Sequence, residues 1–246
     1  MAEPMAERGT AGQRVRAHAV HVFTASGVAL AFLAAQELCR PRPDARLVFA
    51  LFAGTVLIDA LDGPLARAWN VKKFAPAIDG RTIDDILDYI TYTFLPLLLV
   101  WRMGWIPEPG ALFVIPALIA SLFGFANTAA KDEAGGFFLG FPSYWNVVAF
   151  YAGLVHHLHG PWPNAVMLLA LAALTVMPVR FLYPNLAPRP WKMPLLAGAA
   201  LWLAVMIVML ADYPHPPGWL FALSLVYPAF YTMMSILLSR RAPRAA

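Results

Sequence analysis

Long apolar stretches follow one another along the chain, and they restrict the possible folds more than any other feature. There are about eight of them, each near the roughly 20 residues that a helix needs to cross a bilayer core. Of the 246 residues, 60% are hydrophobic and only 13% are charged, so a soluble domain is excluded. We expect an all-α fold, a polytopic membrane helix bundle that forms a single domain over residues 1–246. The expected spans are His18–Leu38, Ala45–Trp69, Thr82–Trp101, Ala111–Ala129, Ser143–His157, Ala165–Phe181, Met193–Leu210 and Trp219–Leu238.

The basic residues indicate how the spans are oriented. Most Lys and Arg residues fall in short breaks on one side of an eight-span arrangement, which predicts that this side and both termini are cytoplasmic. The net charge of +4 is explained in this way without a nucleic-acid partner. Before the first span, Arg14–Val22 forms either an interfacial amphipathic helix or an ordinary flank of the span. The single cysteine, Cys39, excludes an internal disulfide.

Carboxylates interrupt two of these apolar stretches at helical spacing. Asp59 and Asp62 lie three residues apart in the second span, and Asp84 and Asp88 lie four apart in the third, so each pair shares one helix face. The two spans are expected to be antiparallel neighbours, which brings up to four carboxylates together near the cytoplasmic end. Ionised carboxylates repel one another and are costly near lipid, and hard divalent cations such as Mg²⁺ or Mn²⁺ relieve both problems. The spacing therefore predicts a metal site.

Small residues and one arginine accompany the acids. Gly63 and Gly80 let a ligand approach the helix backbone closely, although each costs about 1 kcal/mol of helix propensity relative to alanine. Ala66 adds little bulk, and Arg67 has a permanent charge that suits a phosphate. Together these residues indicate a pocket for a metal-bound ligand that contains phosphate.

The pattern D-x-x-D-G-x-x-A-R, followed after the twelve residues Ala68–Asp79 by G-x-x-x-D-x-x-x-D, resembles the signature of the CDP-alcohol phosphatidyltransferases. It covers Asp59–Asp88. The spacer is longer than is usual in that superfamily, and with about eight spans the chain is most similar to the bacterial phosphatidylcholine synthase branch. That branch transfers the phosphatidyl group of CDP-diacylglycerol to choline and releases CMP.

This resemblance implies a role for each motif position. Two divalent ions, Mn²⁺ or Mg²⁺, would be bound at the acids, and Asp88 would also act as the general base on the attacking hydroxyl. The glycines and the alanine would make room for the cytidine and its ribose. The expected metal ligands are Asp59, Asp62, Asp84 and Asp88. The expected residues binding the nucleotide and CDP-diacylglycerol are Asp59, Gly63, Ala66, Arg67 and Gly80.

Choline requires a site that the shared motif does not supply. Its trimethylammonium group donates no hydrogen bonds and is recognised best by aromatic faces with an acid nearby. The stretch Lys131–Asn146 is the richest in aromatic residues on the inferred cytoplasmic side and is similar to a stretch of the choline-using branch. The alternative is that these residues belong to the aromatic belt of any membrane protein. The candidates are Glu133, Tyr144, Trp145 and Asn146, with Tyr183 and Trp191 in reserve.

Other functions remain open from the sequence. A related transferase would use serine, glycerol phosphate or inositol phosphate, but the anionic acceptors would require a basic pocket, which Lys131–Asn146 lacks. A cation transporter with an intramembrane acidic site would place acids on several spans across the membrane depth. The resemblance implies a multi-pass protein of the bacterial inner membrane with its active site facing the cytoplasm. Its expected partners are CDP-diacylglycerol, choline and membrane lipid, together with a second copy in a homodimer.

Overall fold

The computed structural model describes residues 9–128, 130–132 and 135–241, and it is overwhelmingly helical. The chain divides into two compact units, residues 1–95 and 96–246, of which the described parts are considered separately below. This fold is the all-α membrane helix bundle expected from the sequence. The expectation of a single domain over the whole chain stays a prediction.

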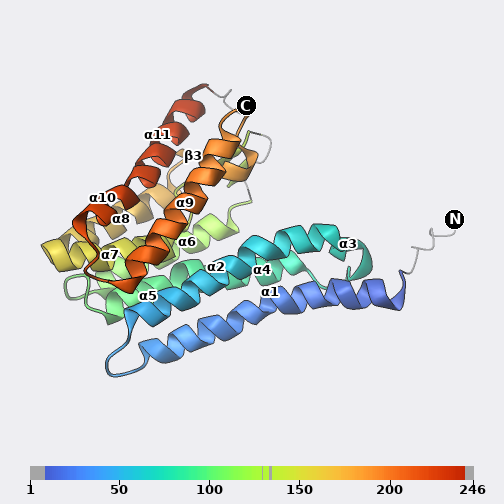
Figure 1. The fold of residues 1–246 in the computed structure, drawn as a ribbon, viewed down its shortest axis with the longest axis horizontal. Helices are drawn as coiled ribbons and strands as arrows, with labels where there is room; N and C mark the ends of the chain where they lie inside the picture. The colour runs from blue at the N-terminus through green and yellow to red at the C-terminus, as the bar shows by residue number, and fades with distance from the viewer. Residues whose placement is uncertain (1–8, 129, 133–134, 242–246) are drawn as a thin grey trace. The chain divides into compact units, whose positions relative to one another are not determined.

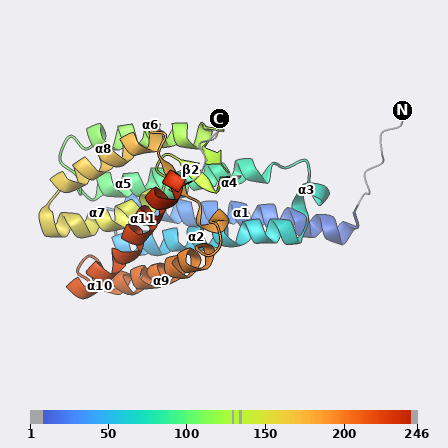
Figure 2. The ribbon, with the colours of Figure 1, turned by 90° about the horizontal axis from the view of Figure 1, so that it is seen from above.

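The first unit is built around two long antiparallel helices. Helices α1 and α2 lie side by side in both ribbon views (Figures 1 and 2). With 28 residues, α1 is about 42 Å long, which exceeds a bilayer core of about 30 Å. Helix α4 packs against α1 and η1 packs against α2. The elements of this unit are α1 (Ala11–Leu38), α2 (Ala45–Ala68), α3 (Val71–Phe74), α4 (Gly80–Asp88) and the π-helical η1 (Tyr89–Phe94).

Local sequence explains where α1 and α2 begin. At the start of α1, Thr10 and Gln13 form a capping box, in which each side chain accepts a hydrogen bond from the backbone of the other. Asp44 caps α2 by accepting from the Arg46 amide at 2.9 Å. The segment Arg14–Val22 is therefore the first part of one continuous helix that begins at Ala11, and its place at the membrane interface stays a prediction.

The second unit combines helices with one small sheet. Helix α8 packs against both α6 and α7, and α11 packs against α9 and β3. The three antiparallel strands were not expected from the sequence. The elements are α5 (Leu95–Arg102), α6 (Ala111–Ala126), β1 (Lys131–Asp132), β2 (Phe137–Leu139), α7 (Trp145–His159), α8 (Trp162–Val176), β3 (Arg180–Leu182), η2 (Pro184–Leu186), α9 (Lys192–Ala211), α10 (Gly218–Ser224) and α11 (Val226–Arg241).

Most expected spans correspond to observed helices, with two informative differences. The span expected over Ala165–Phe181 ends at Val176 instead, because Pro178 disfavours helical geometry at the residue before it, and Phe181 belongs to β3. The span expected over Thr82–Trp101 is helical from Gly80 to Arg102 but contains the π-helical η1. Both differences arise from backbone geometry, to which hydropathy is insensitive.

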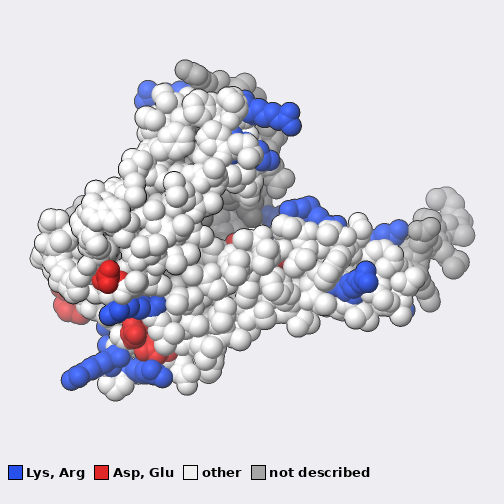
Figure 3. All heavy atoms as spheres, viewed as in Figure 1, with Lys and Arg blue, Asp and Glu red and all other residues white. Residues whose placement is uncertain are grey.

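The surface is consistent with a lipid environment. Among the described residues, four helical segments are long and apolar enough to cross a membrane: Ala11–Leu38, Ala45–Ala68, Lys192–Ala211 and Gly218–Arg240. Ala111–Ala126 and Trp162–Val176 are shorter apolar helices. Charged side chains cover only small parts of the face in Figure 3, and large apolar side chains such as Phe32 and Leu201 are each 69% exposed. The chain is therefore a multi-pass membrane protein, and the number of eight spans stays a prediction.

Candidate metal centre

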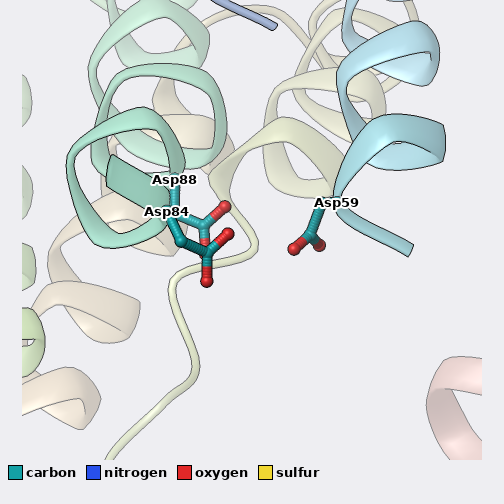
Figure 4. A group of neighbouring side chains, drawn as sticks. All are labelled: Asp59, Asp84 and Asp88. Atoms are coloured by element: carbon teal, nitrogen blue, oxygen red, sulfur yellow. The ribbon is translucent and has the colours of Figure 1, made fainter. Parts of the chain in front are cut away.

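Three carboxylates from two helices of the first unit meet in space. One oxygen atom from each of Asp59, Asp84 and Asp88 lies within 4.8 Å of the others, and all three residues are half-buried. Figure 4 shows Asp84 and Asp88 projecting from α4 toward Asp59 on α2. Asp84 and Asp88 are four residues apart on one helix, so one turn of α4 places both carboxylates on the same side. We call Asp59, Asp84 and Asp88 the acidic group.

The acidic group has the chemistry of a site for a hard cation. Three ionised carboxylates this close repel one another, and a positive charge between them relieves that repulsion. Their oxygens are the ligands that Mg²⁺ and Mn²⁺ prefer, and half-burial leaves one side of the group accessible to water or phosphate. The acidic group could therefore hold a metal ion. This donor set fits the predicted metal site.

The beginning of α4 is fixed by a residue outside the motif. Asp79 caps the helix, with Oδ1 accepting from the Arg81 amide at 3.1 Å and Oδ2 accepting from the Thr82 hydroxyl at 2.7 Å. The hydrogen bond from Thr82 lowers the pKa of the Asp79 carboxyl below its ordinary value. Asp79 thus stabilises the helix end that precedes Asp84 through its capping hydrogen bonds.

A tyrosine that sequence reasoning did not select contacts the acidic group. The Tyr92 hydroxyl donates a hydrogen bond to Oδ2 of Asp59 at 2.7 Å, across 33 residues of sequence. Tyr92 belongs to the π-helical η1, which begins directly after Asp88. π-helical turns frequently occur at functional sites. Tyr92 is four residues after Asp88 and continues the row of Gly80, Asp84 and Asp88, so the sequence did carry a signal for it.

Asp62 lies apart from the acidic group, although it is on the same helix as Asp59. It is buried, and its Oδ2 accepts a hydrogen bond of 2.9 Å from the Thr24 hydroxyl of α1. Thr24 is a second residue that sequence reasoning missed, because nothing in the motif predicts which side chain of α1 faces α2. The structure therefore brings together three of the four predicted metal ligands, and it directs the fourth toward α1.

The predicted nucleotide-binding residues also divide between two environments. A methyl group at Gly63 would meet only the Arg67 guanidinium, at 3.4 Å from Nη1, and Arg67 itself is exposed. Ala66, in contrast, packs against a buried cluster that contains Ala17 and Val20 of α1. A methyl group at Gly80 would lie 2.8 Å from Cε1 of His21, also on α1. Gly63 thus has space beside it, whereas Ala66 and Gly80 face side chains of the same unit.

Asp85 is adjacent to Asp84 in sequence but lies outside the acidic group. Its Oδ2 is 3.6 Å from Nε of Arg81 on the same helix, and both side chains are substantially exposed. Successive residues of a helix are rotated by about 100°, which separates the two neighbouring carboxylates. Asp85 therefore provides a natural control for the acidic residues beside it.

The predicted choline residues lie in different environments of the second unit. Trp145 is fully buried and donates from Nε1 to the Ser121 hydroxyl at 2.7 Å. Asn146 accepts from the Val147 amide at 2.9 Å, close to the start of α7. Tyr144 is 42% exposed, and Tyr183 stacks on Phe138 with ring centroids 5.0 Å apart. Glu133 lies outside the described residues. Of these positions, Tyr144 and Tyr183 best resemble accessible aromatic surfaces.

Comparisons with known proteins agree with the motif. The chain is 40% identical to a phosphatidylcholine synthase of Pseudomonas aeruginosa over 217 residues, which cover 86% of this chain and 88% of the relative. It is 33% identical to the phosphatidylcholine synthase of Legionella pneumophila over 237 residues, covering 92% and 89%. It is 34% identical to that of Bradyrhizobium diazoefficiens over 211 residues, covering 83% and 75%. No family model and no solved structure matches the chain.

Proposed function

Because the chain belongs to the phosphatidylcholine synthase family, we propose that it transfers the phosphatidyl group of CDP-diacylglycerol to choline and releases CMP. The single observation that best supports this proposal is the convergence of Asp59, Asp84 and Asp88. Membership of a family of phosphatidyltransferases also favours an enzyme over the cation transporter that the acidic residues alone would allow. The choice of choline, rather than serine, glycerol phosphate or inositol phosphate, rests on the names of the relatives and on the aromatic segment.

The acidic group would hold two divalent cations, Mn²⁺ or Mg²⁺, through carboxylate oxygens of Asp59, Asp84 and Asp88. Such ions, when bound, neutralise the pyrophosphate of the donor and stabilise the departing CMP. Asp62 also remains a candidate ligand. Since its Oδ2 accepts from Thr24, Oδ1 is the atom that it would offer.

Asp88 is the proposed general base. Its carboxylate would take the proton from the choline hydroxyl as the hydroxyl oxygen forms a bond to the phosphorus that carries diacylglycerol. The bond between that phosphorus and the bridging pyrophosphate oxygen would break, and its electron pair would leave with CMP. Gly63, whose neighbour is the exposed Arg67 guanidinium, is the most suitable motif position for close approach of the donor, and Arg67 would contact a phosphate.

The quaternary ammonium of choline would be bound by aromatic surfaces of the second unit. Tyr183 and Phe138 form a half-buried stacked pair, and Tyr144 is exposed. A trimethylammonium group is attracted to such ring faces by about 0.5–2 kcal/mol, depending on how far it is desolvated. Trp145 is less suitable, because the protein core encloses its ring. We place the active site on the cytoplasmic side of a bacterial inner membrane, in agreement with the distribution of basic residues.

The proposal is tested with the purified protein in detergent or vesicles. We expect CDP-diacylglycerol, Mn²⁺ and labelled choline to yield labelled phosphatidylcholine and an equal amount of CMP, and chelation with EDTA to stop the reaction. The same assay with labelled serine, glycerol phosphate or inositol phosphate compares the acceptors. Product with one of these alcohols but none with choline would refute the choice of acceptor, and no CMP release with any acceptor would refute the reaction.

A further inference from the structure

Helix α1 contributes no residue to the acidic group, yet it contacts both helices that do. One close contact with α4 is at His21, which is 6% exposed and lies over Gly80. A methyl group at position 80 would be 2.8 Å from Cε1 and 3.1 Å from Nδ1 of the His21 ring. Carbon atoms in favourable contact are about 3.5–4.0 Å apart, so no side chain fits at position 80 unless α4 or the ring moves.

A second close contact between α1 and α4 lies about two turns further along both helices, with the glycine on α1 instead of α4. Here the glycine, Gly27, belongs to α1, and a methyl group on it would lie 2.6 Å from Cδ2 of Leu87 on α4. The two contacts are six residues apart on α1 and seven apart on α4, or about 9 and 10.5 Å along the helix axes, as expected for parallel neighbours. Each helix thus inserts one side chain into a glycine position of the other, which fixes their separation and their register.

Between these two contacts, α1 also holds α2. Thr24 donates its hydroxyl to Oδ2 of Asp62 at 2.9 Å. A methyl group at Gly54 of α2 would lie 2.8 Å from Cδ1 of Leu30, which shows a similarly close approach further along α1. Helix α1 is therefore the element against which both acid-bearing helices are positioned.

We propose that His21 is a positioning residue for the acidic group. Its ring determines how closely the first turn of α4 approaches α1, and therefore where Asp84 and Asp88, one and two turns later, lie relative to Asp59 on α2. This inference rests on the proposed function of the acidic group as the metal site. Metal–ligand distances tolerate deviations of only about 0.2 Å, whereas relief of the contact at position 80 requires a shift of about 0.7 Å.

The shape of the His21 ring, rather than a hydrogen bond from Nε2, performs this function. Nε2 is buried and has no hydrogen-bond partner within the described part of the chain. A phenylalanine ring would fill nearly the same space without a buried nitrogen that lacks a partner. His21→Phe should therefore preserve the position of α4, whereas His21→Ala should not.

The experiment combines the His21 variants on α1 with a substitution of Gly80 on α4. His21→Ala, His21→Phe, Gly80→Ala and the double variant His21→Ala/Gly80→Ala are prepared in the full chain. Two readouts are measured: the Mn²⁺ concentration that gives half-maximal phosphatidylcholine synthesis, and Mn²⁺ binding by electron paramagnetic resonance. Gly198→Ala in α9 is the matched control, because its methyl group would meet the Tyr227 ring at 2.9 Å in the second unit. Melting temperatures of all variants report the loss of stability separately.

We expect His21→Ala and Gly80→Ala each to raise the required Mn²⁺ concentration at least tenfold. His21→Phe should stay within threefold of the wild type, and the double variant should need several-fold less Mn²⁺ than Gly80→Ala, because removal of the ring gives the methyl group space. Gly198→Ala should lower the melting temperature without changing the Mn²⁺ requirement.

Two results would overturn the positioning role. One is a His21→Phe variant as impaired as His21→Ala, which would show that the nitrogen itself is needed. The other is a double variant no better than Gly80→Ala, which would show that Gly80 serves the ligand and not the ring. Failure of the proposed function is a separate result, since a wild-type protein that synthesises no phosphatidylcholine but binds Mn²⁺ would still allow the variants to be compared by resonance.

Discussion

The acidic group of the first unit and the aromatic residues of the second unit were both predicted from the sequence. In the structure the carboxylates lie together, whereas the aromatic residues lie in different environments. The carboxylates of Asp84 and Asp88 are held by one regular helix, so their spacing in sequence determines their spacing in space. Tyr144 and Trp145 are adjacent in sequence, yet one is 42% exposed and the other is fully buried. Spacing inside a helix therefore placed Asp84 and Asp88 together but did not predict that Asp62 contacts α1 instead. Spacing is uninformative where the chain enters a helix from a loop.

The largest expected effect tests the acidic group directly. Asp88→Asn removes the proposed base while preserving the size of the side chain, and we expect kcat to fall about 10²–10⁴-fold. Binding of CDP-diacylglycerol should remain measurable by equilibrium methods. Asp85→Asn is the matched control, because Asp85 is on the same helix but pairs with Arg81. Wild-type turnover in Asp88→Asn would eliminate the proposed base.

The second prediction separates metal binding from proton transfer. Asp84→Asn replaces a carboxylate of the acidic group by a weaker neutral ligand, so it should raise the Mn²⁺ concentration for half-maximal activity. Changes beside a metal ligand typically cost 10–100-fold, and loss of a ligand should cost at least as much, about tenfold or more. The measurement is activity against Mn²⁺ concentration. If Asp84→Asn reaches half-maximal activity at the same Mn²⁺ concentration as the wild type, Asp84 is not a ligand.

The sequence predicted the fold class and three of the four grouped acids, and local periodicity explains both the helices and the shared face of Asp84 and Asp88. Long apolar stretches predict membrane helices, and i, i+4 spacing predicts a shared helix face. The same spacing extends to Tyr92, four residues after Asp88, but it could not find Thr24, which reaches Asp62 from 38 residues away. Hydrogen-bond partners so distant in sequence are determined by tertiary packing, which the periodicity of one helix does not predict.

Short strands of the second unit could not be predicted from the sequence either. The strands β2 and β3 are three residues each, too short for an alternating pattern to distinguish them from a loop. Their pairing nevertheless determines where Phe138 and Tyr183 lie, because Phe138 is opposite Phe181, the residue two before Tyr183. The aromatic stacking could not be predicted from composition alone.

The third prediction concerns a residue that only the structure identified. Tyr92→Phe keeps the ring of η1 and removes the hydroxyl that donates to Asp59 at 2.7 Å. The carboxylate of Asp59 would lose an orienting hydrogen bond, so we expect metal affinity to fall about tenfold. Calorimetric titration with Mn²⁺ measures this change, and the melting temperature shows whether the unit remains folded. An unchanged affinity would mean that Tyr92 has no part in the site.

The smallest expected effect tests whether the accessible or the buried aromatic residue recognises choline. Tyr183→Ala removes one ring of the stacked pair with Phe138, and the loss of about 0.5–1 kcal/mol of cation–π attraction should raise the KM for choline about two- to fivefold. The KM for CDP-diacylglycerol should not change. Trp145→Phe gives the contrast: it leaves the Ser121 hydroxyl without the hydrogen bond from Nε1, so it should lower the melting temperature and leave the KM for choline unaltered. The opposite pattern, with choline affinity changed by Trp145→Phe and not by Tyr183→Ala, would mean that the enclosed ring forms the ammonium site and that exposure is a poor guide to acceptor binding.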